Sequence, residues 1–172
     1  ILYDKGKTVI VSVPAKRTTV TILSAVTKIG DYAFYGCSNL SDVTIPDTVT
    51  AIGNHSFEYC SELITVTIGK EVKSIGDSAF YGCLKLVEVY NKSTLSLTKG
   101  GSGYGYVAYY AMNVRTLGDD PSIVVNKNGF IFSRFNETNY LMGYAGSSTT
   151  LSMPSSFTLG GTTYNTYGIY EK

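Results

Sequence analysis

Several kinds of residue are scarce in this chain of 172 residues, which has no tryptophan, one histidine, three cysteines and four prolines. Charged side chains make up 16% of the sequence, below the roughly 25% that is usual for globular domains. With 14 basic and 13 acidic residues the net charge is +1, so no strong field attracts nucleic acid or anionic lipid. We therefore expect no nucleic-acid partner.

Long hydrophobic runs are also missing. No apolar stretch approaches the roughly 20 residues that a membrane-spanning helix needs, so we expect no transmembrane segment in this fragment. The chain begins at Ile1 without a methionine or a signal sequence, which indicates a mature or trimmed fragment. Its last residues, YGIYEK, stop partway through what looks like another repeat, so we expect the natural protein to continue beyond Lys172.

What the chain does contain is an internal repeat of constant length. The three blocks 22–44, 45–67 and 68–90 read ILSAVTKIGDYAFYGCSNLSDVT, IPDTVTAIGNHSFEYCSELITVT and IGKEVKSIGDSAFYGCLKLVEVY, with no insertion between them. A fixed period of this size predicts a solenoid, in which each block forms one coil and buries its apolar side by stacking on the next.

Aligning the blocks gives seven apolar columns that we expect to form the core. They are Ile22/Ile45/Ile68, Val26/Val49/Val72, Ile29/Ile52/Ile75, Phe34/Phe57/Phe80, Cys37/Cys60/Cys83, Leu40/Leu63/Leu86 and Val43/Val66/Val89. Seven buried side chains at roughly 1.5–3 kcal/mol each yield about 10–20 kcal/mol per coil. Ordering the backbone of a coil costs about 1–2 kcal/mol for every residue, so an isolated coil should not fold.

Each coil is expected to contain one strand and one short helical turn. The segment L-x-x-V-x-I has alternating apolar positions at its end, as a strand with one buried face requires. Strands of successive coils should pair in parallel at about 4.8 Å. The residues Asp31, Asn54 and Asp77 are good helix N-caps, and the A-F-Y-G-C stretch that follows fits one helical turn on the opposite side.

The same residues carry a family resemblance. The pattern I-G-x-x-A-F-x-x-C-x-x-L-x-x-V-x-I, closed by Pro46, resembles the BspA-like class of bacterial leucine-rich repeats across residues 17–90. The sequence departs from the pattern at Leu23 and Gly69, which replace proline, and at Ser56, which replaces alanine. The resemblance implies a leucine-rich-repeat solenoid: right-handed β/α-type coils, each one block long, a parallel strand ladder, short helical turns opposite, and inserted β-hairpins.

The irregular segments fit the same scheme. Residues 1–16 alternate apolar and polar around Lys5-Gly6, which indicates a hairpin, and residues 130–146 look like a second copy. Asn128-Gly129 indicates a turn between Ile123–Val125 and Phe130–Phe132. We predict a single leucine-rich-repeat domain over 1–172, with a β-hairpin segment (1–16), three regular coils (17–90), a distorted coil with a Gly-rich insertion (91–121), a β-hairpin insertion (122–146) and the start of a further coil (147–172).

The cysteines and the histidine do not form a metal or catalytic motif. A zinc site needs paired C-x-x-C clusters or histidine partners, and each of the three cysteines lies in a different block. We expect buried thiols, with a disulfide between adjacent coils as the open alternative. His55 lies beside the capping residue, and Ser56 falls in a buried column, so a Ser–His pair is not expected. We predict no metal site and no cofactor.

The Gly-rich run at 100–105 is expected to be a flexible insertion rather than a phosphate loop, because it lacks the Lys-Ser/Thr ending. The tyrosines beside it leave two interpretations open. They form a stacking surface for a sugar or peptide, or half of them pack inward on a turn. These tyrosines are Tyr104, Tyr106, Tyr109 and Tyr110.

The outward face of the predicted strands is the candidate binding surface. Its side chains flank the buried valine column and present hydroxyls, carboxylates and one aromatic ring on a rigid frame. They are Thr19, Thr21, Asp42, Thr44, Thr65, Thr67, Glu88 and Tyr90. Asp42 and Glu88 share a column about 9–10 Å apart by strand spacing, near the carboxylate separation of inverting glycosidases. An open face gives no burial that would raise one pKa above the other, so we expect solvated carboxylates instead.

The resemblance implies an extracellular or cell-surface bacterial protein that is associated with adhesion. The sequence favours a non-enzymatic module that binds a protein or glycan on host or neighbouring cells, through the strand face or through the hairpin loops. Two alternatives remain open: a structural spacer that presents another domain, and more distantly a carbohydrate-active enzyme that uses Asp42 and Glu88.

Overall fold

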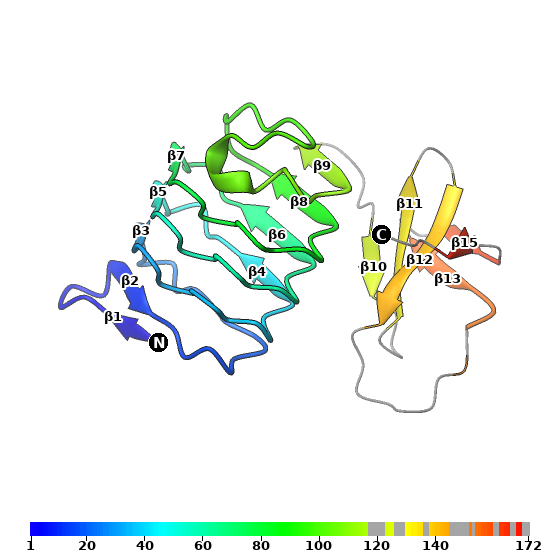
Figure 1. Cartoon of the computed structure of the whole chain (residues 1–172), viewed down its shortest axis with the longest axis horizontal. Coiled ribbons are helices and arrows are strands. Elements are labelled where there is room, and N and C mark those ends of the chain that lie inside the picture. Colours follow the sequence, from blue (N-terminus) through cyan, green and yellow to red (C-terminus); the bar gives the residue numbers. More distant parts are fainter. Residues whose placement is uncertain are drawn as a thin grey trace. The chain divides into compact units, whose positions relative to one another are not determined.

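The protein divides into two compact units, Ile1–Leu117 and Gly118–Lys172. The structure, a computed structural model, describes residues 1–116, 123–125, 130–135, 138–144, 152, 154–159, 162–165 and 168–169. The first unit is a stack of coils (Figure 1). Within the described residues, no helix is long and apolar enough to cross a membrane. The sequence expectation of one repeat domain over 1–172 stays a prediction.

The strands predicted from the alternating apolar pattern form one parallel ladder. Its members, in the order β4-β6-β8-β9, are β4 (Asp42–Thr44), β6 (Thr65–Ile68), β8 (Glu88–Asn91) and β9 (Asn113–Thr116). The register pairs Val43 with Val66, Val66 with Val89 and Val89 with Val114, so like residues lie over like. This ladder confirms the predicted solenoid of stacked coils.

A second ladder lies on the other side of the coils (Figure 1) and was not expected from the sequence. Its order is β1-β2-β3-β5-β7, with bounds β1 (Leu2–Tyr3), β2 (Val9–Ser12), β3 (Lys28–Ile29), β5 (Ala51–Ile52) and β7 (Ser74–Ile75). The first two strands are antiparallel, and the other neighbours are parallel. The N-terminal hairpin therefore adds two strands to the start of this ladder.

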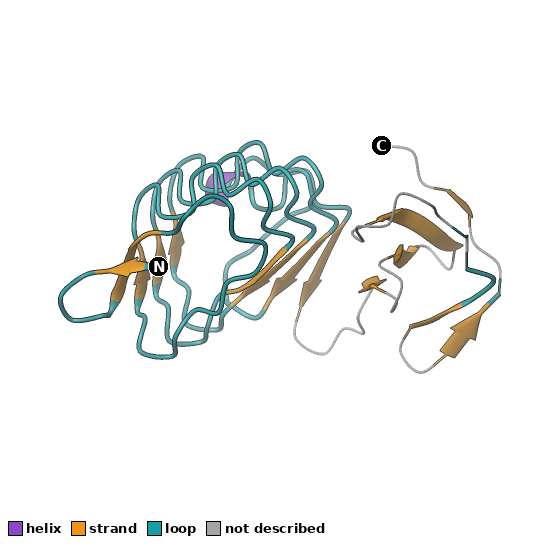
Figure 2. Cartoon of the chain, turned by 90° about the horizontal axis from the view of Figure 1, so that it is seen from below, coloured by secondary structure: helices purple, strands orange, loops and turns teal. Residues whose placement is uncertain are grey.

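The expected helical turn is replaced by a non-helical turn in each regular coil. Among the described residues the only helical element is the 3-10 helix η1 (Tyr104–Tyr106) in the fourth coil (Figure 2). The non-helical turn forms a corner of each regular coil. Its residues Tyr32, His55 and Ser78 have φ of 56°, 54° and 52°, which a right-handed helix does not allow. The corner backbone instead bonds to the neighbouring coil, as where the Phe34 N–H donates to the Ser56 carbonyl (2.7 Å).

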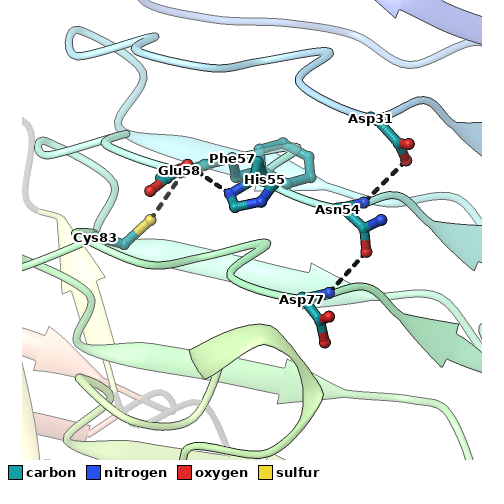
Figure 3. A network of polar contacts seen from close by, with 7 residues as sticks. All are labelled: Asp31, Asn54, His55, Phe57, Glu58, Asp77 and Cys83. Carbon is teal, nitrogen blue, oxygen red and sulfur yellow. Dashed lines mark hydrogen bonds and ion pairs between the residues drawn. The ribbon is translucent and has the colours of Figure 1, made fainter.

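The residues expected as helix caps also join neighbouring coils. The Asn54 N–H donates to Asp31 Oδ1 (3.0 Å), and the Asp77 N–H donates to Asn54 Oδ1 (2.9 Å), as Figure 3 shows. Each carboxylate or amide oxygen thus satisfies a backbone donor one coil further along, not one in its own turn. A polar column with one member in each regular coil therefore runs along the stack.

The core of the first unit consists of the predicted columns. The rings of Phe34, Phe57 and Phe80 are fully buried and stacked, with centroids 4.5 Å and 4.9 Å apart. Ile75 is the exception among the column residues, since it is only partly buried. The fourth coil continues the core with Val107, Ala108 and Ala111, although its sequence no longer follows the repeat.

The second unit contains two small sheets. The larger has the order β10-β11-β12-β15, with bounds β10 (Ile123–Val125), β11 (Phe130–Phe135), β12 (Thr138–Tyr144) and β15 (Gly168–Ile169). The smaller pairs β13 (Phe157–Leu159) antiparallel with β14 (Thr162–Tyr164). Phe130, Phe132, Leu141 and Phe157 form its buried cluster. The expected turn at Asn128-Gly129, and much of the expected further coil at 147–172, lie outside the described residues.

Candidate functional site

The candidate surface is the outward face of the β4-β6-β8-β9 ladder. Strand register places Asp42 beside Thr65, Thr65 beside Glu88 and Glu88 beside Asn113. A second outward column runs from Thr44 through Thr67 and Tyr90 to Arg115. Because side chains alternate across a strand, both columns lie on the face opposite the buried valines. The structure therefore brings six of the eight predicted residues onto one face.

Exposure falls along this face from the first strand to the third. Asp42 and Thr44 on β4 are exposed, Thr65 and Thr67 on β6 are half-buried, and Glu88 on β8 is buried. Thr19 and Thr21 are exposed but belong to no strand, so they stand outside the ladder. The part of the predicted surface that solvent reaches best is the edge formed by β4 and β6.

The expected solvation of Glu88 is wrong. Its relative exposure is 4%, and Arg115 Nη2 lies 3.3 Å from Glu88 Oε1. The guanidinium carbon of Arg115 lies 3.6 Å from the centroid of the Tyr90 ring, a cation–π contact. Arg115 thus covers both predicted residues. Sequence reasoning missed it because Arg115 lies in the distorted fourth coil, where the repeat gives no alignment.

The arrangement does not suit the glycosidase alternative. A glycosidase needs both of its carboxyl groups beside the bond that it cleaves. Asp42 is exposed and accepts a hydrogen bond from the Ser41 hydroxyl at 3.1 Å, whereas Glu88 is buried and its Oε1 accepts hydrogen bonds from Nε and Nη2 of Arg115 at 3.3 Å. Because Arg115 covers Glu88, the two carboxylates do not face a common ligand on the open surface.

The three cysteines are buried free thiols. Cys60 Sγ contacts the Phe34 carbonyl oxygen at 3.2 Å, and Cys83 Sγ contacts that of Phe57 at 3.3 Å (Figure 3 shows the second contact). Burial raises the pKa of Cys83 to about 12 and raises the pKa of Cys60 further. Both thiols therefore stay protonated and unreactive at neutral pH. Within the part of the chain that the structure describes, no group of three His, Cys, Asp or Glu side chains is placed to hold a metal ion.

His55 lies in a contact between coils. Its Nδ1 is 2.7 Å from Glu58 Oε2 (Figure 3), and its ring stacks on Tyr32 with centroids 4.8 Å apart and planes 9° apart. Ser56 is fully buried on the core side. The histidine is thus held by an acid and an aromatic ring at the corner of the coil.

The chain matches a known family over its repeat region. The family described as "BspA type Leucine rich repeat region (6 copies)" matches residues 15–103. None of the curated proteins that were compared matches the chain.

Three solved structures are similar to the chain. A T. pallidum leucine-rich repeat protein is 25% identical, with a TM-score of 0.40, and the match covers 54% of this chain and 45% of that protein. A leucine-rich repeat protein from Eubacterium ventriosum is 18% identical (TM-score 0.32; 73% and 41% covered). A leucine-rich cell surface protein from Faecalibacterium prausnitzii is 21% identical (TM-score 0.28; 70% and 44% covered). The chain thus spans less than half the length of each of these proteins.

The family match extends over more than half of the chain and takes in the three regular coils and the beginning of the fourth. The parallel ladders and stacked phenylalanines of those coils are the structure that such a repeat requires. The chain belongs to the BspA-type leucine-rich repeat family.

Proposed function

We propose that the chain is a non-enzymatic binding module of a bacterial cell-surface or secreted protein, and that it engages a protein or glycan on host or neighbouring cells. The proposal is supported by the family, and by a similar structure that is described as a cell surface protein. Solenoids present extended, rigid faces to their partners, and a face of this kind needs no catalytic group.

The observation that carries the proposal is the exposed edge of the β4-β6-β8-β9 ladder. Asp42 and Thr44 are exposed on β4, and Thr65 and Thr67 lie beside them in register on β6. One carboxylate and three hydroxyls therefore stand on a backbone that hydrogen bonds to its neighbours fix in place. Little conformational entropy is lost when a partner binds such a preorganised surface.

The test is a binding screen in which labelled protein is offered to a panel of purified extracellular-matrix proteins and to a glycan array. The Asp42→Arg/Thr65→Arg double variant reverses the charge of the surface and adds bulk to it at two positions that lie side by side in register. We expect it to weaken binding by about tenfold or more, which corresponds to ~1.4 kcal/mol. A matched control is Lys28→Glu, a charge reversal at an exposed position of β3 on the other ladder.

Unchanged affinity of the double variant would remove this face from consideration. Absence of binding to every member of both panels would instead favour the spacer, in which the coils only hold another domain at a distance.

A further inference from the structure

A row of tyrosine rings lies along the corner of the coils, away from the strand face. We propose that this tyrosine row, defined as Tyr35, Tyr59, Tyr81, Tyr106 and Tyr109, is a binding surface for a linear, neutral polysaccharide chain. The inference does not depend on the β4-β6 edge, since it concerns other residues and a different part of each coil.

The row has one ring in each of the first three coils and two in the fourth, with a nearly constant spacing. Ring centroids are 5.8 Å apart from Tyr35 to Tyr59, 6.0 Å from Tyr59 to Tyr81 and 5.4 Å from Tyr81 to Tyr106. Tyr109 continues the row within the fourth coil at 5.5 Å. The exposed fractions of Tyr35, Tyr59, Tyr81 and Tyr109 are 47%, 47%, 40% and 48%. A continuous aromatic surface therefore runs along four coils.

The second coil keeps its ring in the row at the expense of backbone strain. Glu58 occupies the column of Tyr35 and Tyr81, and the ring moves to Tyr59, in the column of Gly36 and Gly82. Tyr59 has φ 59°, in the left-handed region that costs a non-glycine residue about 1–2 kcal/mol. Gly36 and Gly82 have positive φ at the same position, so the turn sets this conformation and Tyr59 adopts it where the other regular coils have glycine.

Gly82 leaves room for this displaced ring. A Cβ built at Gly82 would lie 2.6 Å from Tyr59 Cδ1, so any larger residue there would push the ring away. Edge-to-face contacts between rings contribute only about 0.5–1.5 kcal/mol each, so they offset part of the strain. The rings nevertheless remain half-exposed. The remaining exposed aromatic surface is what a ligand would cover.

The chemistry of the row favours sugar rings. The face of a tyrosine ring carries partial negative charge and attracts polarised C–H groups, which line the faces of a pyranose. The phenol hydroxyls can donate to and accept from sugar hydroxyls. Neighbouring rings of the row are turned by 73° to 82°, so a ligand lying flat along it meets the faces of alternate rings and the edges of the others.

The charges beside the row favour a neutral chain. The row itself contains no Lys or Arg, and the half-buried carboxylate of Glu58 lies next to Tyr59 in the sequence. Tyr32, next to Asp31, widens the surface because its ring is 5.8 Å from that of Tyr35. Carboxylates accept hydrogen bonds from neutral sugars and repel sulfated or uronic-acid chains.

The regular spacing favours a polymer over a folded partner. A solenoid row presents one chemical group at fixed intervals, so it matches a ligand that repeats one group along its own length. A polyproline II peptide is the competing occupant, since aromatic grooves bind such peptides. Its turn advances about 9 Å, close to the distance between alternate coils at strand spacing, but proline residues offer the phenol oxygens no hydrogen-bond donor, whereas sugar hydroxyls do.

Affinity electrophoresis of the whole chain tests the proposal, with cellulose derivative, chitosan acetylated to neutrality, mannan, xylan or β-1,3-glucan in the gel. We expect at least one of these neutral polysaccharides to retard the protein, and neither heparin nor a proline decamer to bind. Tyr59→Gly/Tyr81→Ala should weaken the binding by about tenfold or more. Tyr59→Gly removes a ring while relieving positive-φ strain, so its unfolding midpoint should not fall, which separates loss of binding from loss of fold.

Lys28→Glu, at an exposed position of β3 that belongs to neither surface, is the control and should leave retardation unchanged. The proposal is overturned if none of the neutral polysaccharides binds, if the double tyrosine variant binds as the wild type does, or if heparin or the proline decamer binds instead. Because the Asp42→Arg/Thr65→Arg screen reports on the other face, failure here leaves the function proposed above standing, and the converse also holds.

Discussion

At the scale of single residues, one position of the repeat places a polar atom in the buried core. Ser56 replaces the alanine found at Ala33 and Ala79, and all three side chains are buried. No described group accepts or donates a hydrogen bond at Ser56 Oγ. A buried hydroxyl without a partner costs about 1–3 kcal/mol, so the repeat alanine suits this position better than serine does.

Ser56→Ala is therefore expected to raise the free energy of unfolding by about 1–2 kcal/mol, because it removes the unpaired hydroxyl and leaves only the methyl group that the column already holds. Urea denaturation followed by circular dichroism measures the change. Ser38→Ala, at an exposed position of the first coil, should change the stability by less than about 0.5 kcal/mol. A destabilised Ser56→Ala would mean that the hydroxyl has a partner, such as a buried water.

The buried thiols lead to a second expectation at this scale. Burial raises the pKa values of Cys60 and Cys83, and the thiolate is the reactive form. We expect neither residue to react with iodoacetamide in the folded protein at neutral pH, and both to react in concentrated guanidinium chloride. Mass spectrometry counts the adducts, and a cysteine introduced by Ser38→Cys provides the exposed control. Rapid alkylation of the folded wild type would contradict the buried column.

At the scale of elements, some parts of each coil could be predicted from the sequence and others could not. The ladder strands and their apolar columns were predictable because Val43, Val66 and Val89 alternate with polar neighbours in every block. The ladder of β3, β5 and β7 was not, because its strands have only two residues and so show no alternation. The corner was mistaken for a helical turn because a cap residue precedes an apolar run there.

The candidate site was likewise predictable from the sequence only in part. Repeat alignment placed Asp42 and Thr65 correctly on one face, since both belong to regular coils. It could not foresee that Arg115 covers Glu88 and Tyr90, because coil four lacks the pattern. Nor did alignment by column reveal the tyrosine row, since Tyr59 is shifted by one position from Tyr35 and Tyr81 and only the three-dimensional structure shows that the rings meet.

Ionic contacts of Asp47 also join neighbouring coils. Asp47 Oδ1 accepts hydrogen bonds from Lys92 Nζ (2.7 Å) and from the Lys70 backbone N–H (3.1 Å), which belong to the two following coils. These contacts, led by the Lys92 hydrogen bond, hold the pKa of Asp47 below its ordinary value. A depressed carboxyl pKa stabilises the fold at pH values above the unfolded-state pKa, and that stabilisation is lost as the pH falls through the folded-state pKa.

Asp47→Asn should therefore reduce the stability at about pH 6 and have a much smaller effect in strong acid, where wild-type Asp47 is protonated too. Urea denaturation from about pH 6 down to about pH 2 measures the difference in unfolding free energy between wild type and variant. This difference should begin to decline near pH 4, because the unfolded aspartate has its ordinary pKa of about 3.9. Lys92→Met is the companion variant. In its background, the effect of Asp47→Asn on the unfolding free energy should depend much less on pH. A difference between Asp47→Asn and wild type that stays constant with pH would show that the contact is not electrostatic.

At the scale of the whole molecule, stability is expected to come from contacts between neighbouring coils. Many described backbone groups at the corner bond to the next coil, and the polar column, the cysteines and the phenylalanines all join residues of adjacent coils. In such a stack the free energy is a sum of intrinsic terms and nearest-neighbour interface terms. A change in a central coil therefore weakens two interfaces at once.

Phe57→Ala tests this coupling, because the Phe57 ring is stacked between those of Phe34 and Phe80 at 4.5 Å and 4.9 Å. Truncating a fully buried phenylalanine costs about 3–5 kcal/mol of unfolding free energy. Because this ring contacts both neighbouring coils, we expect the coil unit to unfold in one cooperative step with a lower urea midpoint. Tyr35→Ala removes a half-exposed ring from the same corner and should cost far less. Tyrosine fluorescence and far-ultraviolet circular dichroism, followed in parallel, measure the shift. If Phe57→Ala cost no more than Tyr35→Ala, or if the two signals separated into independent steps, the coils would not be coupled through their phenylalanine column. The two proposed binding surfaces would then lack the rigid frame that they require.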